Sequence, residues 1–198
     1  MTAARRATAS TAPPSGPPPL PRLTAPWSVR AARPDAHDAQ LLAGWMAEPH
    51  VERFWQQAWP RRRWAEEIET QLAGHHSLPC LVTEGTREIA YVEIYRVRLD
   101  RLAAAYPHRE TDLGVHIAVG GRSDTGRGLG RRLIAALADG LLAADPACTR
   151  VVAEPDIRNE PSLRAFAAAG FRHSGEITLP DKTAALLVRP RSDKDLPR

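Results

Sequence analysis

The chain has 198 residues, of which 25% are charged, and its formal net charge at pH 7 is +4. This length suits one domain with its own hydrophobic core. Only two of the 27 basic residues are lysines, and acids and bases are interspersed after residue 34. The basic balance therefore does not indicate a nucleic-acid partner. The longest apolar run, LIAALADGLLAA, contains an aspartate and is too short to span a bilayer, so we expect no membrane partner.

The first 26 residues differ in composition from the rest. They contain seven prolines and no acidic residue, so we expect a disordered tail with polyproline-like character. A folded domain is expected over 27–190 and a flexible C-terminus over 191–198. Periodicity and turn residues predict eleven elements in the order β-α-α-β-β-β-α-β-α-β-β. Their expected ranges are 27–34, 35–49, 61–74, 78–84, 87–97, 111–119, 128–144, 149–154, 161–170, 171–179 and 183–188.

The cysteines and histidines give no sign of a metal site. Cys80 and Cys148 lie far apart and match neither a zinc spacing nor a disulfide framework. The adjacent His75 and His76 match no zinc pattern either. We therefore expect no metal, two reduced thiols and a cytoplasmic protein.

A glycine-rich stretch, TGRGLGRRL at 125–133, follows one predicted strand and opens a predicted helix. Free N–H groups and the dipole at a helix N-terminus favour phosphate, and Gly126, Gly128 and Gly130 allow the backbone to approach it closely. The stretch lacks the Gly-Lys-Ser/Thr of a Walker A loop and the spacing of a dinucleotide-binding motif. Taken alone, it is equally consistent with a glycine loop before a buried helix.

A second motif lies about thirty residues later. The segment NEPSLRAFAAAGF at 159–171 resembles the N-x-x-A-x-x-x-Y-x-x-x-G-F signature of the GCN5-related N-acetyltransferase (GNAT) superfamily. The glycine stretch resembles that superfamily's Q/R-x-x-G-x-G/A pyrophosphate loop, with Thr125 where Gln or Arg is usual. The resemblance covers roughly residues 27–190. It implies an α+β fold with a mixed, mostly antiparallel sheet of about seven strands, splayed at its centre and flanked by about four helices.

The same resemblance implies acetyl-CoA or another acyl-CoA as co-substrate. Phe166 stands where the superfamily often has a tyrosine that protonates the leaving thiolate, and a phenyl ring cannot donate a proton. The residues that the resemblance assigns to coenzyme A are Ile117, Val119, Gly126, Arg127, Gly128, Leu129, Gly130, Asn159, Ser162 and Phe166.

Two residues are candidates for the acceptor chemistry. In DLGVHIAV, period two places His116 on the face opposite the branched aliphatic residues, among small neighbours. Asp156 in AEPDIRN lies just past the next strand. Because the ends of these strands are expected to flank the splay, we predict that His116 and Asp156 form a general-base site. The alternatives are a structural histidine and a capping or turn-forming aspartate.

A narrower resemblance joins five segments: an early Phe54-Trp55, YVEIYR, GVHIAV, AEPDIRN and LPDKTAAL. Together they resemble siderophore-pathway acyltransferases, which acylate hydroxylysine or hydroxycadaverine to give a hydroxamate. That resemblance implies that His116 and Asp156 act on the acceptor. We add Trp55, Glu93 and Tyr95 as predicted acceptor-pocket residues, with Glu93 able to bind a cationic amine. The alternatives are helix packing for Trp55 and, for Glu93, an exposed ion pair with Arg96 or Arg98.

We therefore predict direct, base-assisted transfer of an acetyl- or succinyl-class group from acyl-CoA to an N-hydroxyamine, with no covalent enzyme intermediate. An aminoglycoside-type N-acetyltransferase and a non-catalytic CoA-binding module are the alternatives. The expected partners are small molecules only. The sequence leaves open the acyl chain length, the choice between hydroxylysine and a diamine, and whether the protein is a monomer or a homodimer.

Overall fold

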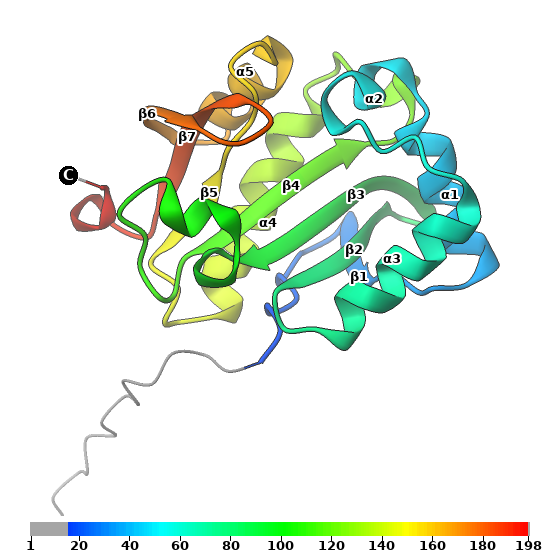
Figure 1. The fold of residues 1–198 in the computed structure, drawn as a ribbon, viewed down its shortest axis with the longest axis horizontal. Helices are drawn as coiled ribbons and strands as arrows, with labels where there is room; N and C mark the ends of the chain where they lie inside the picture. The colour runs from blue at the N-terminus through cyan, green and yellow to red at the C-terminus, as the bar shows by residue number, and fades with distance from the viewer. Residues whose placement is uncertain (1–15, 198) are drawn as a thin grey trace, which may run out of the picture.

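The computed structural model describes residues 16–197, which form a seven-stranded sheet in the order β1-β2-β3-β4-β5-β7-β6 (Figure 1). All neighbouring strands are antiparallel except β4 and β5, which are parallel. The strands are β1 (Trp27–Ala31), β2 (Ser77–Glu84), β3 (Arg87–Arg96), β4 (Leu113–Val119), β5 (Arg150–Ala153), β6 (Arg172–Thr178) and β7 (Thr183–Pro190). The helices are α1 (Ala36–Met46), α2 (Pro49–Trp55), α3 (Arg61–Ala73), α4 (Leu129–Ala144) and α5 (Glu160–Ala168).

The predicted fold class is confirmed, with one helix more than expected. We expected a single helix within 35–49, but α1 ends at Met46 and Pro49 begins the separate helix α2. Proline suits a first helical turn because the N–H that it lacks would have no partner there. This extra helix matters for function, since it carries Phe54 and Trp55 toward the centre of the sheet.

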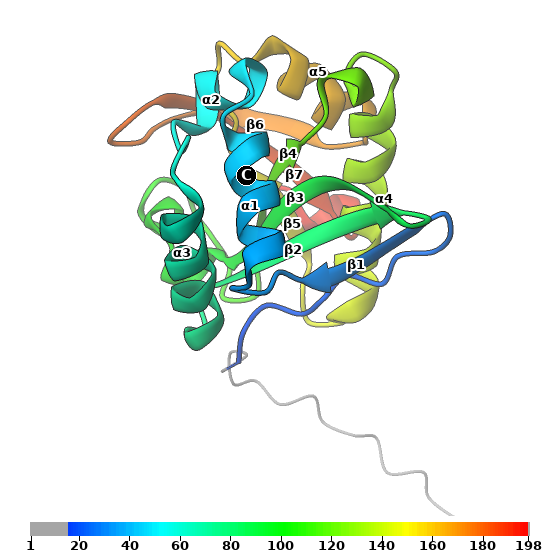
Figure 2. The same cartoon turned by 90° about the vertical axis from the view of Figure 1, so that its right-hand side faces the viewer.

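Helices cover both faces of the sheet, with α1 and α3 on one side and α4 on the other (Figure 2). Because successive side chains of a strand point to opposite faces of the sheet, each face packs its own part of the hydrophobic core against the helices that cover it. Tyr91 and Ala118 pack with α1 and α3, whereas Val92 and Val115 pack with the apolar side of α4. Full burial of each valine or larger apolar side chain stabilises the folded state by about 1.5–3 kcal/mol.

The two parallel strands meet only at their starts. Leu113 pairs with Val151 and Gly114 with Val152, and beyond these residues β4 and β5 separate. The residues at the two starts form a buried ion pair in which Arg150 Nε and Nη2 donate to Asp112 at 2.8 and 2.5 Å. The expected central splay is therefore present, and this ion pair lies at its closed end.

The described parts of the two expected tails, residues 16–26 and 191–197, contact the domain. Residues 1–15 of the predicted disordered segment lie outside the described residues. Residues 16–26 instead pack on the domain, because the Arg96 guanidinium donates to the carbonyls of Gly16 and Pro17 and the backbone N–H of Arg22 donates to Gly140. The expected flexible C-terminus contains a 3-10 turn at Asp193–Asp195, and Arg109 contacts Asp195 at 2.6 Å.

Candidate active site

Strand register brings His116 and Glu93 together. The two residues are direct partners across β3 and β4, so their side chains share a face, and His116 Nδ1 lies 3.2 Å from Glu93 Oε2. The next partners on that face are Tyr95 and Gly114. A Cβ at Gly114 would lie 1.9 Å from the Tyr95 ring, so glycine leaves the space in which that ring packs 4.8 Å from the imidazole of His116.

A second carboxylate, Glu154, holds the other side of the imidazole. It follows β5 directly, is almost fully buried, and its Oε1 lies 2.5 Å from His116 Nε2. Its other oxygen accepts a hydrogen bond from the Tyr95 hydroxyl at 2.6 Å. Lys182, in the turn between β6 and β7, reaches within 3.8 Å of Glu154. The imidazole therefore lies in a chain of three charged groups, Glu93, His116 and Glu154.

The carboxylates set the charge of His116. Burial alone would lower its pKa, but Glu154 and Glu93 outweigh burial and raise the pKa of His116 to about 10. Burial likewise disfavours ionised carboxylates, yet contact with His116 lowers the pKa of Glu154 to about 2 and holds that of Glu93 below its ordinary value. At neutral pH His116 is therefore an imidazolium that donates from both ring nitrogens, and the acceptors of the chain are the two carboxylates.

These groups lie in a cleft of about 230 Å³ where β4 and β5 separate. Helix α2 lines it with Phe54 and Trp55, and Trp55 also packs against Tyr91. The predicted pocket position of Trp55 and its alternative role in packing are thus both present. The remaining lining residues come from β3, β4, the end of β5, α5, the segment after β3 and the β6–β7 turn, and include Glu93, His116, Ile117, Glu154, Asp156, Asn159, Ser162, Phe166 and Lys182.

Asp156 lines the same cleft as His116, as predicted, and its carboxylate is held by Arg158. Its Oδ1 accepts from the backbone and Nε of Arg158, and its Oδ2 accepts from Arg158 Nη2 at 2.6 Å. The hydrogen bond from Arg158 lowers the pKa of Asp156 to about 2. The carboxylate in contact with His116 is Glu154, two residues earlier. His116 and Asp156 line one cleft, and their joint action on the acceptor stays a prediction.

The other predicted acceptor residues lie close to His116. Tyr95 and Glu93 contact it directly, as described above. The alternative for Glu93, a pair with a following arginine, is not what the structure shows, since Glu93 accepts hydrogen bonds from Tyr91 and Gln71. Sequence reasoning missed Glu154 and Lys182. The sequence signal for Glu154 was an acidic residue at the end of a short, predicted apolar strand.

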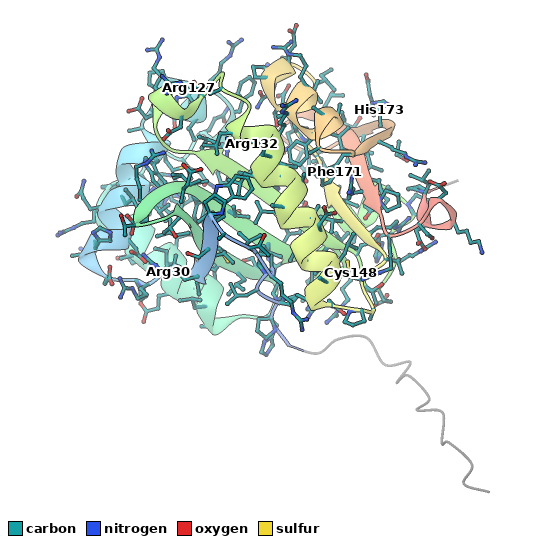
Figure 3. All side chains as sticks on the ribbon, turned by 180° about the vertical axis from the view of Figure 1, so that it is seen from behind. Arg30, Arg127, Arg132, Cys148, Phe171 and His173 are labelled. Atoms are coloured by element: carbon teal, nitrogen blue, oxygen red, sulfur yellow. The ribbon has the colours of Figure 1, made fainter. Side chains whose placement is uncertain are left out.

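The glycine loop has the features that a pyrophosphate requires. Gly126 and Gly128 have φ values of +75° and +73°, which disfavour other residues. Gly128 is the N-cap of the 16-residue helix α4 and has no side chain to cap it. The first N–H groups of this helix, which have no partner within the helix, therefore receive no side-chain cap from Gly128. Figure 3 shows Arg127 in this loop and Arg132 on the helix. The loop thus fits an anionic diphosphate.

The remaining predicted coenzyme A residues lie between this loop and the cleft. Asn159 caps α5 by accepting from the Ser162 N–H at 3.2 Å. Phe166 packs edge-on against Phe171 and also lines the cleft. Ile117 and Val119 lie in the part of β4 beyond its pairing with β5, although the carbonyl of Val119 accepts a hydrogen bond from His50. An extended ligand arm could pair with this open strand edge.

Comparison with known proteins agrees with this geometry. Residues 35–179 match the family model described as an acetyltransferase (GNAT) domain. The chain belongs to the GNAT acetyltransferase family. A lysine N-acyltransferase MbtK of Mycobacterium sp. (strain MCS) is 33% identical over 91% of this chain and 73% of its own. An N-hydroxyputrescine acetyltransferase of Acinetobacter baumannii is 31% identical over 75% of this chain and 71% of its own. A crystal structure of an uncharacterized Bacillus halodurans protein has a TM-score of 0.80 and 28% identity, and covers 89% of this chain and 92% of that one.

As a GNAT acetyltransferase, the protein is an enzyme that uses an acyl-CoA donor. Burial raises the pKa of the thiols of Cys80 and Cys148 to about 12, so neither is a ready nucleophile at neutral pH. Within 16–197, no group of three or more His, Cys, Asp or Glu side chains is arranged to hold a metal ion. No helix in that part of the GNAT chain is long and apolar enough to cross a bilayer.

Proposed function

We propose that the protein transfers an acetyl- or succinyl-class group from acyl-CoA to the N-hydroxyamine of hydroxylysine or a hydroxylated diamine, in the biosynthesis of hydroxamate siderophores. The proposal rests on the Glu93–His116–Glu154 chain at the point where β4 and β5 separate. The Mycobacterium and Acinetobacter relatives, a lysine N-acyltransferase and an N-hydroxyputrescine acetyltransferase, support an amine of this kind as acceptor. Its setting is iron acquisition, and its location is the cytoplasm.

The acceptor reacts by direct attack. An N-hydroxyamine is much less basic than an alkylamine, so its nitrogen is largely neutral near pH 7. As the C–N bond forms, negative charge develops on the thioester oxygen, and strand N–H groups near Ile117 and Ala118 stabilise it. A carboxylate of the charged chain takes the amine proton, while His116 stays an imidazolium that donates to both carboxylates and holds them in place. Glu154 is the carboxylate that acts through contact with His116, and Asp156 faces the acceptor in the same cleft.

The donor occupies the other part of the cleft. The glycine loop and the N-terminus of α4 hold the pyrophosphate, and the open edge of β4 with Asn159 holds the pantetheine arm. The C–S bond breaks toward the side lined by Phe166, which supplies no proton. The proton that leaves the amine balances the one gained by the thiolate, so the products are a hydroxamate and free coenzyme A.

One assay tests this function. We expect purified protein with acetyl-CoA or succinyl-CoA to release free thiol fastest when N-hydroxycadaverine or N6-hydroxylysine is the acceptor. Kanamycin and a reaction without acceptor are the comparison arms. Faster turnover of kanamycin would favour an aminoglycoside acetyltransferase. Coenzyme A binding without turnover of any acceptor would favour a non-catalytic module.

The pyrophosphate site makes a separate prediction. Gly130 lies in the first turn of α4, and a Cβ there would meet only Ala165 at an ordinary 3.9 Å. Gly130→Asp places a negative charge beside the bound diphosphate, whereas Gly130→Asn has almost the same shape without the charge. We expect the KM for acyl-CoA of the aspartate variant to be about tenfold higher than that of the asparagine variant. A charge at a helix terminus changes an interaction free energy by up to about 2 kcal/mol, and tenfold corresponds to about 1.4 kcal/mol. Steady-state kinetics at low salt measures this, and equal KM values for the two variants would place the diphosphate elsewhere.

A further inference from the structure

A second cavity, of about 340 Å³, adjoins the catalytic groups. It shares Gln57, Glu93 and His116 with the first cleft, and it extends from them to α3 and to the segment that follows β3. Any molecule whose reacting end lies at His116 can therefore place its other end in this cavity. The residues that line it determine which end group fits there.

The lining is rich in hydrogen-bond acceptors and negative charge. Glu67, Glu93 and Asp100 contribute three carboxylates, and no lysine or arginine is among the described residues that line this cavity. Gln71 Nε2 donates to Glu67 at 2.8 Å and to Glu93 at 3.1 Å, which fixes the orientation of its amide. Asp100 accepts hydrogen bonds from the Leu102 N–H and from His76.

Two buried acceptor atoms in this lining have no donor. The Oε1 atoms of Gln71 and Gln57 are buried and accept no hydrogen bond from the described residues. A buried polar atom without a partner is unfavourable, so such atoms indicate a ligand that supplies donors. An ammonium group supplies three N–H donors and a positive charge. A carboxylate supplies acceptors only, and it would face the like charges of Glu67 and Asp100, since the imidazolium of His116 at the edge of the cavity is already paired with Glu93 and Glu154.

We propose that this cavity binds the far ammonium group of the acceptor, and that the acceptor is a mono-N-hydroxylated α,ω-diamine rather than a hydroxylated amino acid. The inference rests on the proposed function and narrows it to one of its two substrate classes. A diamine places its hydroxylated nitrogen at His116 and its ammonium among Glu67, Asp100 and the glutamine oxygens. A hydroxylysine would bring its α-carboxylate to the same acidic lining.

Three acceptors of equal chain length test the substrate class: N-hydroxycadaverine, N6-hydroxylysine and N-hydroxypentylamine. The second adds an α-carboxylate, and the third lacks the ammonium group. With saturating acetyl-CoA, we expect kcat/KM for N-hydroxycadaverine to exceed both others by about tenfold or more, the size expected of one charge-assisted hydrogen bond. A kcat/KM for hydroxylysine equal to or above that of the diamine would overturn this inference and leave the proposed function standing. If none of the three were acylated, the proposed function itself would fall.

Variants on one helix test the position of the ammonium group. Glu67→Gln removes a charge from the cavity, and Glu66→Gln removes its neighbour, which is exposed and paired with Arg62. We expect Glu67→Gln to reduce the ratio of kcat/KM for N-hydroxycadaverine to that for N-hydroxypentylamine about fivefold or more, and Glu66→Gln to leave the ratio unchanged. Asp100→Asn is the second cavity variant, because asparagine can still accept from the Leu102 N–H. If both cavity variants fold and neither changes the ratio, the ammonium group does not lie in this cavity.

Discussion

Replacing Glu154 by glutamine is expected to lower kcat by roughly 100-fold or more, the usual size of a lost general acid–base group. Glu154 is the nearer of the two carboxylates on His116, and it also accepts from Tyr95. Glutamine keeps the size of the side chain but can neither accept the amine proton nor hold the imidazolium by charge. Thiol release under saturating acyl-CoA and acceptor measures the change.

The pKa of His116 is the readout that separates catalysis from packing. Glu154 raises this pKa, so Glu154→Gln should lower it from about 10 toward the ordinary 6.5, and an NMR titration of the imidazole would follow the shift. A raised folded-state pKa adds stability that is complete below about pH 6.5 and is lost as the pH rises through about 10. The variant should therefore lose less stability across that range than the wild type. Glu176→Gln, on the exposed surface of β6, is the control. Unchanged kcat and an unchanged His116 pKa in Glu154→Gln would remove Glu154 from the mechanism.

The face of His116 was predictable from sequence, but its partner was not. Strand β4 alternates apolar and small residues, and this pattern alone assigns His116 to the side opposite Val115 and Ile117. Strand β5 is buried throughout, so its sequence has no alternation that could mark a face. The position of Glu154 depends on how β5 diverges from β4, which is a long-range property of the sheet. Asp156 was the more conspicuous acid, but a local hydrogen bond from Arg158 occupies it.

The donor side was more predictable because its motif is local. Gly128 is the N-cap of α4 with a positive φ, as a close-approach loop before a helix requires. Such a turn depends on a few adjacent residues, so a short motif is enough to find it. The proposed acceptor side draws on α2, α3 and the four strands β2, β3, β4 and β5, whose residues are spread over much of the sequence. That difference explains why the sequence indicated the donor more fully than the acceptor.

Replacing Asp112 by alanine is expected to lower the free energy of unfolding by about 3–5 kcal/mol, the cost of leaving one member of a buried ion pair without its partner. Asp112 and Arg150 are both almost fully buried. Asp112 also accepts from the Tyr106 hydroxyl and from the Arg109 N–H, so the variant removes the acceptor of four hydrogen bonds from three residues. Urea unfolding measures this loss of free energy from the shift in midpoint, and an unchanged m-value shows that the same surface is exposed on unfolding.

Two further variants show whether the stability lost in Asp112→Ala comes from an unpaired buried charge or from the loss of any ion pair. Asp193→Ala breaks an ion pair with Arg172 at the surface, where Asp193 is 82% exposed, and should change stability by less than about 1 kcal/mol. The double variant Asp112→Leu/Arg150→Met removes both charges and should be more stable than Asp112→Ala, because no unpaired charge remains buried. Since the ion pair lies where β4 and β5 are still joined, its loss should also loosen the closed end of the splay and raise KM for acyl-CoA. If Asp112→Ala were as stable as Asp193→Ala, the buried pair would not hold the two strands together, and the width of the cleft would have to be set by the pairing of Leu113 and Gly114 alone.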